Sequence, residues 1–96
     1  MKRFQAIVHF EMDKDFMSLL PPHRTYINYL INKQVIDSYA VSMESQTVWI
    51  TINALSKADA DQYLAKSPLY PYWRYEIEEL QIYDGQVFRM PTLQMN

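Results

Sequence analysis

The stretch VIDSYAVSMESQTVWITINA, residues 35–54, decides the fold class of this 96-residue chain. Its second half, TVWITINA, alternates strictly between aliphatic residues and polar or aromatic ones. Alternation with period two predicts a β-strand with one buried face. Residues 35–43 also have an extended pattern, and Glu44-Ser45-Gln46 between the two halves contains no glycine. The stretch therefore predicts a β-hairpin closed by a loose loop rather than by a tight primed turn.

The residues on either side of this hairpin predict two helices. The first begins near Pro22, because proline is well tolerated in a first helical turn. The second begins after the N-cap residue Ser56 and ends before Pro68. The residues expected on the inward faces of the two helices are Tyr26, Ile27, Leu30, Ile31, Ala60, Tyr63 and Leu64.

Two outer strands complete the pattern. Residues 4–10 alternate, with apolar side chains at the even positions. In the last strand, residues 74–83, the apolar parity changes between Ile77 and Leu80, and a β-bulge near Glu78-Glu79 restores a single apolar face. The order strand, helix, strand, strand, helix, strand predicts an α+β, ferredoxin-like βαββαβ domain with a four-stranded antiparallel sheet. This single domain covers residues 1–85, and residues 86–96 form a C-terminal tail that either frays or contacts a partner subunit.

In such a fold both helices lie on one face of the sheet, so the other face needs a cover. We expect Ile7, Tyr39 and Trp49 on this second face, where they are too apolar to meet water. The sequence therefore predicts a homodimer in which two sheets pack against each other as a dimeric α/β barrel.

Composition excludes several classes of function. Nine basic residues against eleven acidic ones give a formal net charge of −2, which offers no basic surface for nucleic acid or an anionic membrane. A single glycine excludes the glycine-rich loops that hold nucleotide phosphates. With no cysteine and two distant histidines, we expect no metal site, and we also expect no organic cofactor. A helix that spans a membrane needs about 20 apolar residues, and no apolar run in the sequence approaches this length. We expect a cytoplasmic protein.

Residues 67–77, SPLYPYWRYEI, resemble the Leu-Pro-Leu-Phe-Pro-Tyr-Met-x-Ile-Glu-Val segment of the muconolactone delta-isomerase family. The similarity covers residues 3–80, and the Pro-Leu-aromatic-Pro-Tyr block is its specific part. The resemblance implies a dimeric α/β barrel and a cofactor-free proton shift in a small unsaturated lactone acid. The family has a glycine near the position of Gln34, and tryptophan–arginine pairs near Ile36-Asp37 and Ala40-Val41. The arginines that hold an anionic substrate in that family are therefore missing from these positions.

A second resemblance points to the same fold. Pro21-Pro22-His23-Arg24 and Ser38-Tyr39-Ala40-Val41-Ser42 are similar to segments of YciI-like proteins, small barrels that carry a histidine on the first helix and mostly lack an established reaction. Together the two resemblances leave two functions open. One is an isomerase-like protein that binds a small organic acid or unsaturated lactone, and the other is a non-catalytic dimeric binding or assembly module.

Two histidines and an arginine are the candidate catalytic residues. His23 and Arg24 lie in the first turn of the predicted helix, where the helix dipole disfavours positive charge. Together with free backbone amides they form a candidate carboxylate-binding corner, unless both side chains simply point into water. His9, with Glu11 on the same strand face, is the candidate general base beside a carbonyl. The alternative for His9 is a hydrogen bond within a dimer interface.

The candidate ligand-binding residues share the face of His9 in the predicted barrel. The large flat ring of Trp49 suits a small unsaturated ligand, although aromatic residues on such a face also serve interface packing. For Asp37 the alternative is a solvated strand end. The four candidates are Ile7, Asp37, Tyr39 and Trp49.

Overall fold

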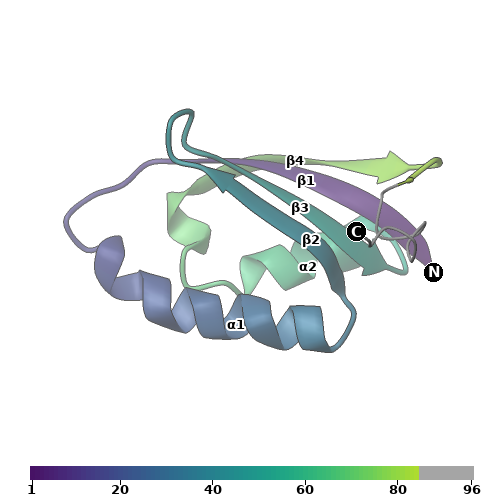
Figure 1. The fold of residues 1–96 in the computed structure, drawn as a ribbon, viewed down its shortest axis with the longest axis horizontal. Coiled ribbons are helices and arrows are strands. Elements are labelled where there is room, and N and C mark those ends of the chain that lie inside the picture. The colour runs from purple at the N-terminus through teal and green to yellow at the C-terminus, as the bar shows by residue number, and fades with distance from the viewer. Residues whose placement is uncertain (85–96) are drawn as a thin grey trace, which may run out of the picture.

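The computed structural model describes residues 1–84, which form a four-stranded antiparallel sheet with two helices on one face (Figure 1). The strands lie in the order β2-β3-β1-β4. This α+β architecture is compatible with the predicted ferredoxin-like fold. The expected tail at residues 86–96 lies outside the described residues. In chain order the elements are β1 (Lys2–Phe10), a 3-10 turn (Met17–Leu19), α1 (Leu20–Asn32), β2 (Ile36–Ser42), β3 (Thr47–Ala54), α2 (Lys57–Ala65), a second 3-10 turn (Tyr70–Tyr72) and β4 (Trp73–Leu80).

The hydrophobic core lies between the sheet and the two helices. As predicted, the even positions of β1 are buried, and so are the aliphatic positions of β3. Each large apolar side chain buried here contributes about 1.5–3 kcal/mol to the free energy of unfolding. The buried apolar residues are Phe4, Ala6, Val8, Phe10, Phe16, Ile27, Leu30, Ile36, Val48, Ile50, Ile52, Ala54, Ala60, Leu64, Leu69 and Trp73.

Helix α1 begins at Leu20, so both prolines lie in its first turn. Its buried stripe consists of His23, Ile27 and Leu30, at the i, i+4 and i+7 spacing of a helix face. The prediction that Ile31 faces inward was wrong, because the stripe turns that side chain to its flank, where it is 38% exposed.

The C-terminal end of α1 is closed by a Schellman motif. Gln34 adopts the left-handed conformation with φ 64° and donates its backbone N–H to the Ile31 carbonyl at 3.0 Å. The Val35 N–H donates to the Leu30 carbonyl at 2.9 Å. These two bonds satisfy carbonyls that the helix end leaves without partners. Glutamine thus occupies a backbone conformation that usually selects glycine.

The hairpin of β2 and β3 forms as predicted, but its register separates two residues that were expected on one face. The loop at residues 43–46 has an even number of residues, so positions of opposite parity pair: Tyr39 lies opposite Ile50, and Ala40 opposite Trp49. Tyr39 therefore faces the helices, whereas Trp49 lies on the open face of the sheet. The prediction that Tyr39 and Trp49 share a face was wrong.

Strand β4 pairs with β1 without interruption, from Arg3 opposite Leu80 to Phe10 opposite Trp73. The predicted bulge near Glu78-Glu79 was therefore wrong. Ile77 lies opposite Ala6 and faces the core, while Leu80 falls on the open face. The apolar parity changes because neither later residue belongs to the core face: Leu80, the last residue of β4, lies on the open face, and Ile82 lies beyond the strand and is exposed.

Candidate functional site

A pocket of about 360 Å³ opens between the start of α1 and the edge strand β2. It brings together three of the predicted site residues, His23, Arg24 and Tyr39. The first two come from α1, and the tyrosine comes from β2 because of the hairpin register. The remaining wall is apolar and consists of Leu20, Pro21 and Val41.

The His23 ring is fixed by contacts from three directions. Its Nδ1 atom lies 2.7 Å from Ser67 Oγ, and its Nε2 atom lies 2.7 Å from the Tyr39 hydroxyl. Trp73 packs edge-on against the ring, with the centroids 5.6 Å apart and an interplanar angle of 89°. The side chain is only 2% exposed, so it neither points into water nor forms an open corner. Both ring nitrogens have partners, as a buried imidazole requires.

Burial sets the charge of this pair. Desolvation by burial, with a smaller contribution from the neighbouring charge of Arg24, lowers the pKa of His23 to about 4. Burial also raises the pKa of Tyr39, although the charge of Arg24 acts in the opposite direction. At neutral pH the imidazole is therefore neutral and the phenol protonated, and Arg24 alone carries the positive charge at the start of α1.

Arg24 is exposed at the rim of the pocket. Its guanidinium carbon lies 5.6 Å from the centroid of the Tyr39 ring, within cation–π range. Among residues 1–84, no carboxylate lies within salt-bridge distance of Arg24, since the two ion pairs there are Lys2 with Glu79 and Arg3 with Asp37. The pocket thus offers a cation that has no acidic partner in the described part of the chain, beside an apolar wall.

The other candidate residues lie on the open face of the sheet, away from this pocket. Ile7 lies opposite Trp49, which is 38% exposed. His9 Nδ1 lies 3.4 Å from Thr47 Oγ1 on the neighbouring strand. Because His9 and His23 lie on opposite sides of the sheet, one chain does not assemble a site from His9 and Arg24.

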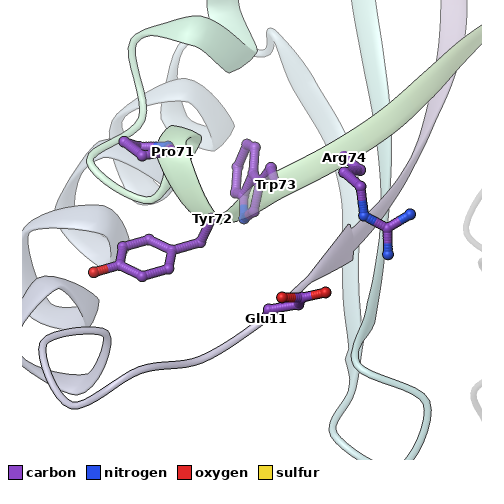
Figure 2. A pocket seen from close by; sticks show the side chains of 5 residues that line it. All are labelled: Glu11, Pro71, Tyr72, Trp73 and Arg74. Carbon is purple, nitrogen blue, oxygen red and sulfur yellow. The ribbon is translucent and has the colours of Figure 1, made fainter.

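Glu11, which was expected beside His9, lines a smaller pocket where β1 ends. This pocket has a volume of about 220 Å³ and lies against the start of β4 (Figure 2). Figure 2 shows the Glu11 and Arg74 side chains extending toward the same opening, beside Trp73 and Tyr72. The Tyr72 hydroxyl donates to Asp13 Oδ1 at 3.0 Å, which ties the loop after β1 to the start of β4.

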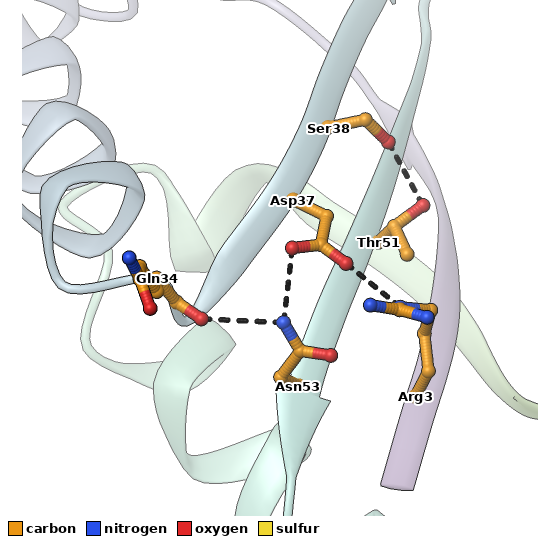
Figure 3. A network of polar contacts seen from close by, with 6 residues as sticks. All are labelled: Arg3, Gln34, Asp37, Ser38, Thr51 and Asn53. Atoms are coloured by element: carbon orange, nitrogen blue, oxygen red, sulfur yellow. Dashed lines mark hydrogen bonds and ion pairs between the residues drawn. The ribbon is translucent and has the colours of Figure 1, made fainter. Parts of the chain in front are cut away.

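Asp37 takes part in a polar network at one end of the open face (Figure 3). Its carboxylate accepts from Arg3 Nε at 2.7 Å and from Asn53 Nδ2 at 3.0 Å. Asn53 also donates to the Gln34 carbonyl at 3.2 Å. The β2–β3 register shifts between Ile36 and Ser38, so Asp37 sits in a β-bulge. These contacts connect three strands and explain Asp37 as a structural residue.

Sequence reasoning missed Ser67 as a site residue. Ser67 lies between α2 and β4, 44 positions from His23, and the two meet only in the folded chain. The Pro68 that follows predicted a helix end, but no spacing linked Ser67 to α1. Leu20 and Val41 were missed for the same reason, since the register that brings β2 beside the start of α1 is not visible in either segment alone.

The fold and the site define a class of protein: a small α+β domain with a pocket on the helix side of its sheet, lined by one positively charged side chain, that of Arg24. Comparison with protein-family models gives no match, and no curated protein matches the chain. The resemblances to muconolactone isomerases and YciI-like proteins therefore stay predictions. Within residues 1–84, no helix is long and apolar enough to cross a membrane, and no three acidic or histidine side chains gather as metal ligands. The expected cytoplasmic location also stays a prediction.

Proposed function

We propose that this protein binds a small organic acid in the pocket between α1 and β2. Arg24 holds the carboxylate, and Leu20, Pro21 and Val41 contact the apolar body of the ligand. The observation that carries the proposal is an arginine with no acidic partner among residues 1–84, placed beside the hydrogen-bonded His23–Tyr39 pair in an otherwise apolar pocket. An arginine–carboxylate contact at such a rim is charge-assisted and among the stronger polar interactions available to a protein.

Binding fits this site better than the proton-shift chemistry of the isomerase family. A general acid or base works best with a pKa near the working pH. The pKa of His23 is about 4 and that of Tyr39 is raised, so each is a poor proton carrier at neutral pH. We therefore expect that unsaturated acids dissolved in D₂O with the protein keep their carbon-bound protons. Deuterium uptake that depends on Tyr39 or His9 is the result that favours an isomerase.

Calorimetric titration with small unsaturated acids, such as sorbate and benzoate, tests the proposal. The Arg24→Gln variant should bind about tenfold more weakly or worse, because it loses a charge-assisted contact worth about 1.5–3 kcal/mol. Arg74→Gln is the matched control, since Arg74 is an exposed arginine on the open face. Failure of every acid to bind, or equal losses in the two variants, contradicts the proposal.

We also propose that the open face packs against a second copy of the chain, as in a dimeric α/β barrel. In the described part of the chain both helices lie on the other face (Figure 1). Ile7 and Trp49 pair at the centre of the open face, and Trp49 is a large side chain left partly in water. Polar side chains, among them Gln5, Thr51 and Glu76, neighbour this pair on the open face. The acid-binding pocket lies on the opposite side of the sheet, so a dimer of this kind would not cover it.

A further inference from the structure

Ser67 has a hydroxyl whose surroundings dictate where its hydrogen points. Its oxygen accepts the Leu69 backbone N–H at 3.0 Å and lies 2.7 Å from His23 Nδ1. Ser67 is 5% exposed. Among residues 1–84, the only acceptor within reach of its hydroxyl hydrogen is His23 Nδ1. A hydroxyl can accept two bonds but has only one hydrogen to donate.

The neutral imidazole of His23 carries one proton, on either Nδ1 or Nε2. If Nδ1 carried it, Ser67 would accept two hydrogen bonds and its own hydrogen would have no acceptor. A buried donor without an acceptor is disfavoured by roughly tenfold or more in population. Ser67 therefore donates to Nδ1, and the proton of His23 sits on Nε2, where it donates to the Tyr39 hydroxyl oxygen at 2.7 Å.

From this polarity we infer that Tyr39 is a hydrogen-bond donor to the ligand, so that the pocket selects a second, acceptor-only oxygen in addition to the carboxylate. The inference rests on the proposed function and narrows its ligand class to acids that carry a carbonyl or a further carboxylate. The Tyr39 hydroxyl hydrogen has no acceptor among the described residues, and both partners of the His23–Tyr39 bond line the pocket. Ser67 acts through His23 and is a positioning residue.

The tautomer of His23 can be read in the free protein, without any ligand. Long-range ¹H–¹⁵N correlation spectra at neutral pH should show a neutral His23 with its proton on Nε2 and with Nδ1 as the downfield nitrogen. Ser67→Thr keeps the hydroxyl donor and should preserve this pattern. Ser67→Ala removes the hydroxyl donor and should change the resonance of His23 Nδ1. A proton on Nδ1 in the wild-type protein overturns the inference whether or not the variants fold.

A matched pair of acids tests the donor role of Tyr39. Levulinate is a γ-keto acid, and valerate has the same five-carbon skeleton and the same net charge but lacks the ketone oxygen. We expect the wild-type protein to bind levulinate at least tenfold more tightly, because only the ketone accepts from Tyr39. Tyr39→Phe should reduce this preference to about twofold or less. Equal binding of the two acids, or a preference that survives in Tyr39→Phe, overturns the inference.

The inference and the proposed function can fail separately. If the proton of His23 is on Nδ1 but Arg24→Gln still weakens acid binding, the donor role of Tyr39 is wrong and the acid site remains. A proton on Nε2, with no acid bound, keeps the hydrogen-bond polarity but overturns both the acid site and the ligand class inferred from it.

Discussion

Burial of the His23 ring among Ser67, Tyr39 and Trp73 makes its protonation costly. A charged imidazole there would lose its hydration and would also face Arg24. The folded protein therefore binds the His23 proton more weakly than the unfolded chain, whose histidine has a pKa near 6.5. Wherever the unfolded state binds more protons, the free energy of unfolding rises with pH.

The contribution of His23 is thus fully present above pH 6.5 and is lost as the pH falls toward the folded-state pKa of about 4. Between about pH 7 and pH 4, we expect the free energy of unfolding of the wild-type protein to fall by about 2 kcal/mol more than that of a His23→Gln variant. This value allows for screening of the charge by solvent. Urea unfolding of both proteins across this range measures the difference. Parallel stability curves for the two proteins contradict the buried, neutral ring.

The sequence pointed to His23 by its place at a helix start, but it did not reveal the environment of the ring. An exposed basic corner and a solvated side chain were the two interpretations, and the structure places the imidazole in a third setting, the core. The helical spacing of His23, Ile27 and Leu30 was the available signal. The partner Ser67 could not be predicted, because its contact with His23 depends on how the whole chain folds.

Two elements end in backbone conformations that are costly for their residues. Gln34 closes α1 with φ 64°, and Gln46 closes the β2–β3 loop with φ 51°. A side chain beyond glycine costs roughly 1–2 kcal/mol in this region, whereas glycine pays a smaller cost in chain entropy. Glycine is the residue that most often occupies such left-handed positions, and here glutamine occupies both of them.

We expect Gln34→Gly to raise the free energy of unfolding by up to about 1 kcal/mol, since it relieves the left-handed backbone and keeps the Schellman bonds. Gln34→Val should lower it, because a β-branched residue tolerates this conformation least. Urea unfolding at neutral pH compares the three proteins. A lower stability for the glycine variant than for the valine variant is incompatible with the described helix end.

At the scale of elements, alternation predicted the strands well and their register poorly. The aliphatic face of β3 was evident in the sequence, because residues that are buried against the helices have to be apolar. The pairing of Tyr39 with Ile50 depended on the length of the loop at residues 43–46, and alternation within a single strand does not report that length. The change of parity in the last strand predicted a bulge, whereas Leu80 at the end of β4 simply lies on the open face.

For the whole molecule, the order of elements was predictable because helical and strand periodicities alternate clearly along the chain. The side of the sheet that holds the site was not, since one register step moves every side chain of a strand to the other face. His9 and Trp49 lie on the open face as predicted, whereas the pocket proposed to bind an acid lies on the helix side, between α1 and β2. The two faces therefore carry separate proposals, assembly and binding.

The assembly proposal predicts a dimer in sedimentation velocity experiments at micromolar concentration. Trp49→Glu should shift the protein to a monomer, because it places a charge at the centre of the packed face. Tyr29→Glu is the control, as Tyr29 is a similarly exposed aromatic residue on α1. A wild-type monomer, or dissociation by both substitutions alike, speaks against a barrel closed through the open face.

The central claim is that a small acid binds on the helix side of the sheet, and one titration tests it most directly. ¹⁵N-labelled protein is titrated with levulinate, and the backbone amide shifts are mapped onto the fold. The account predicts the largest shifts at Leu20, His23 and Arg24 in α1 and at Tyr39 and Val41 in β2, all of which line the pocket. Shifts concentrated on the open face, around His9 and Trp49, would contradict it.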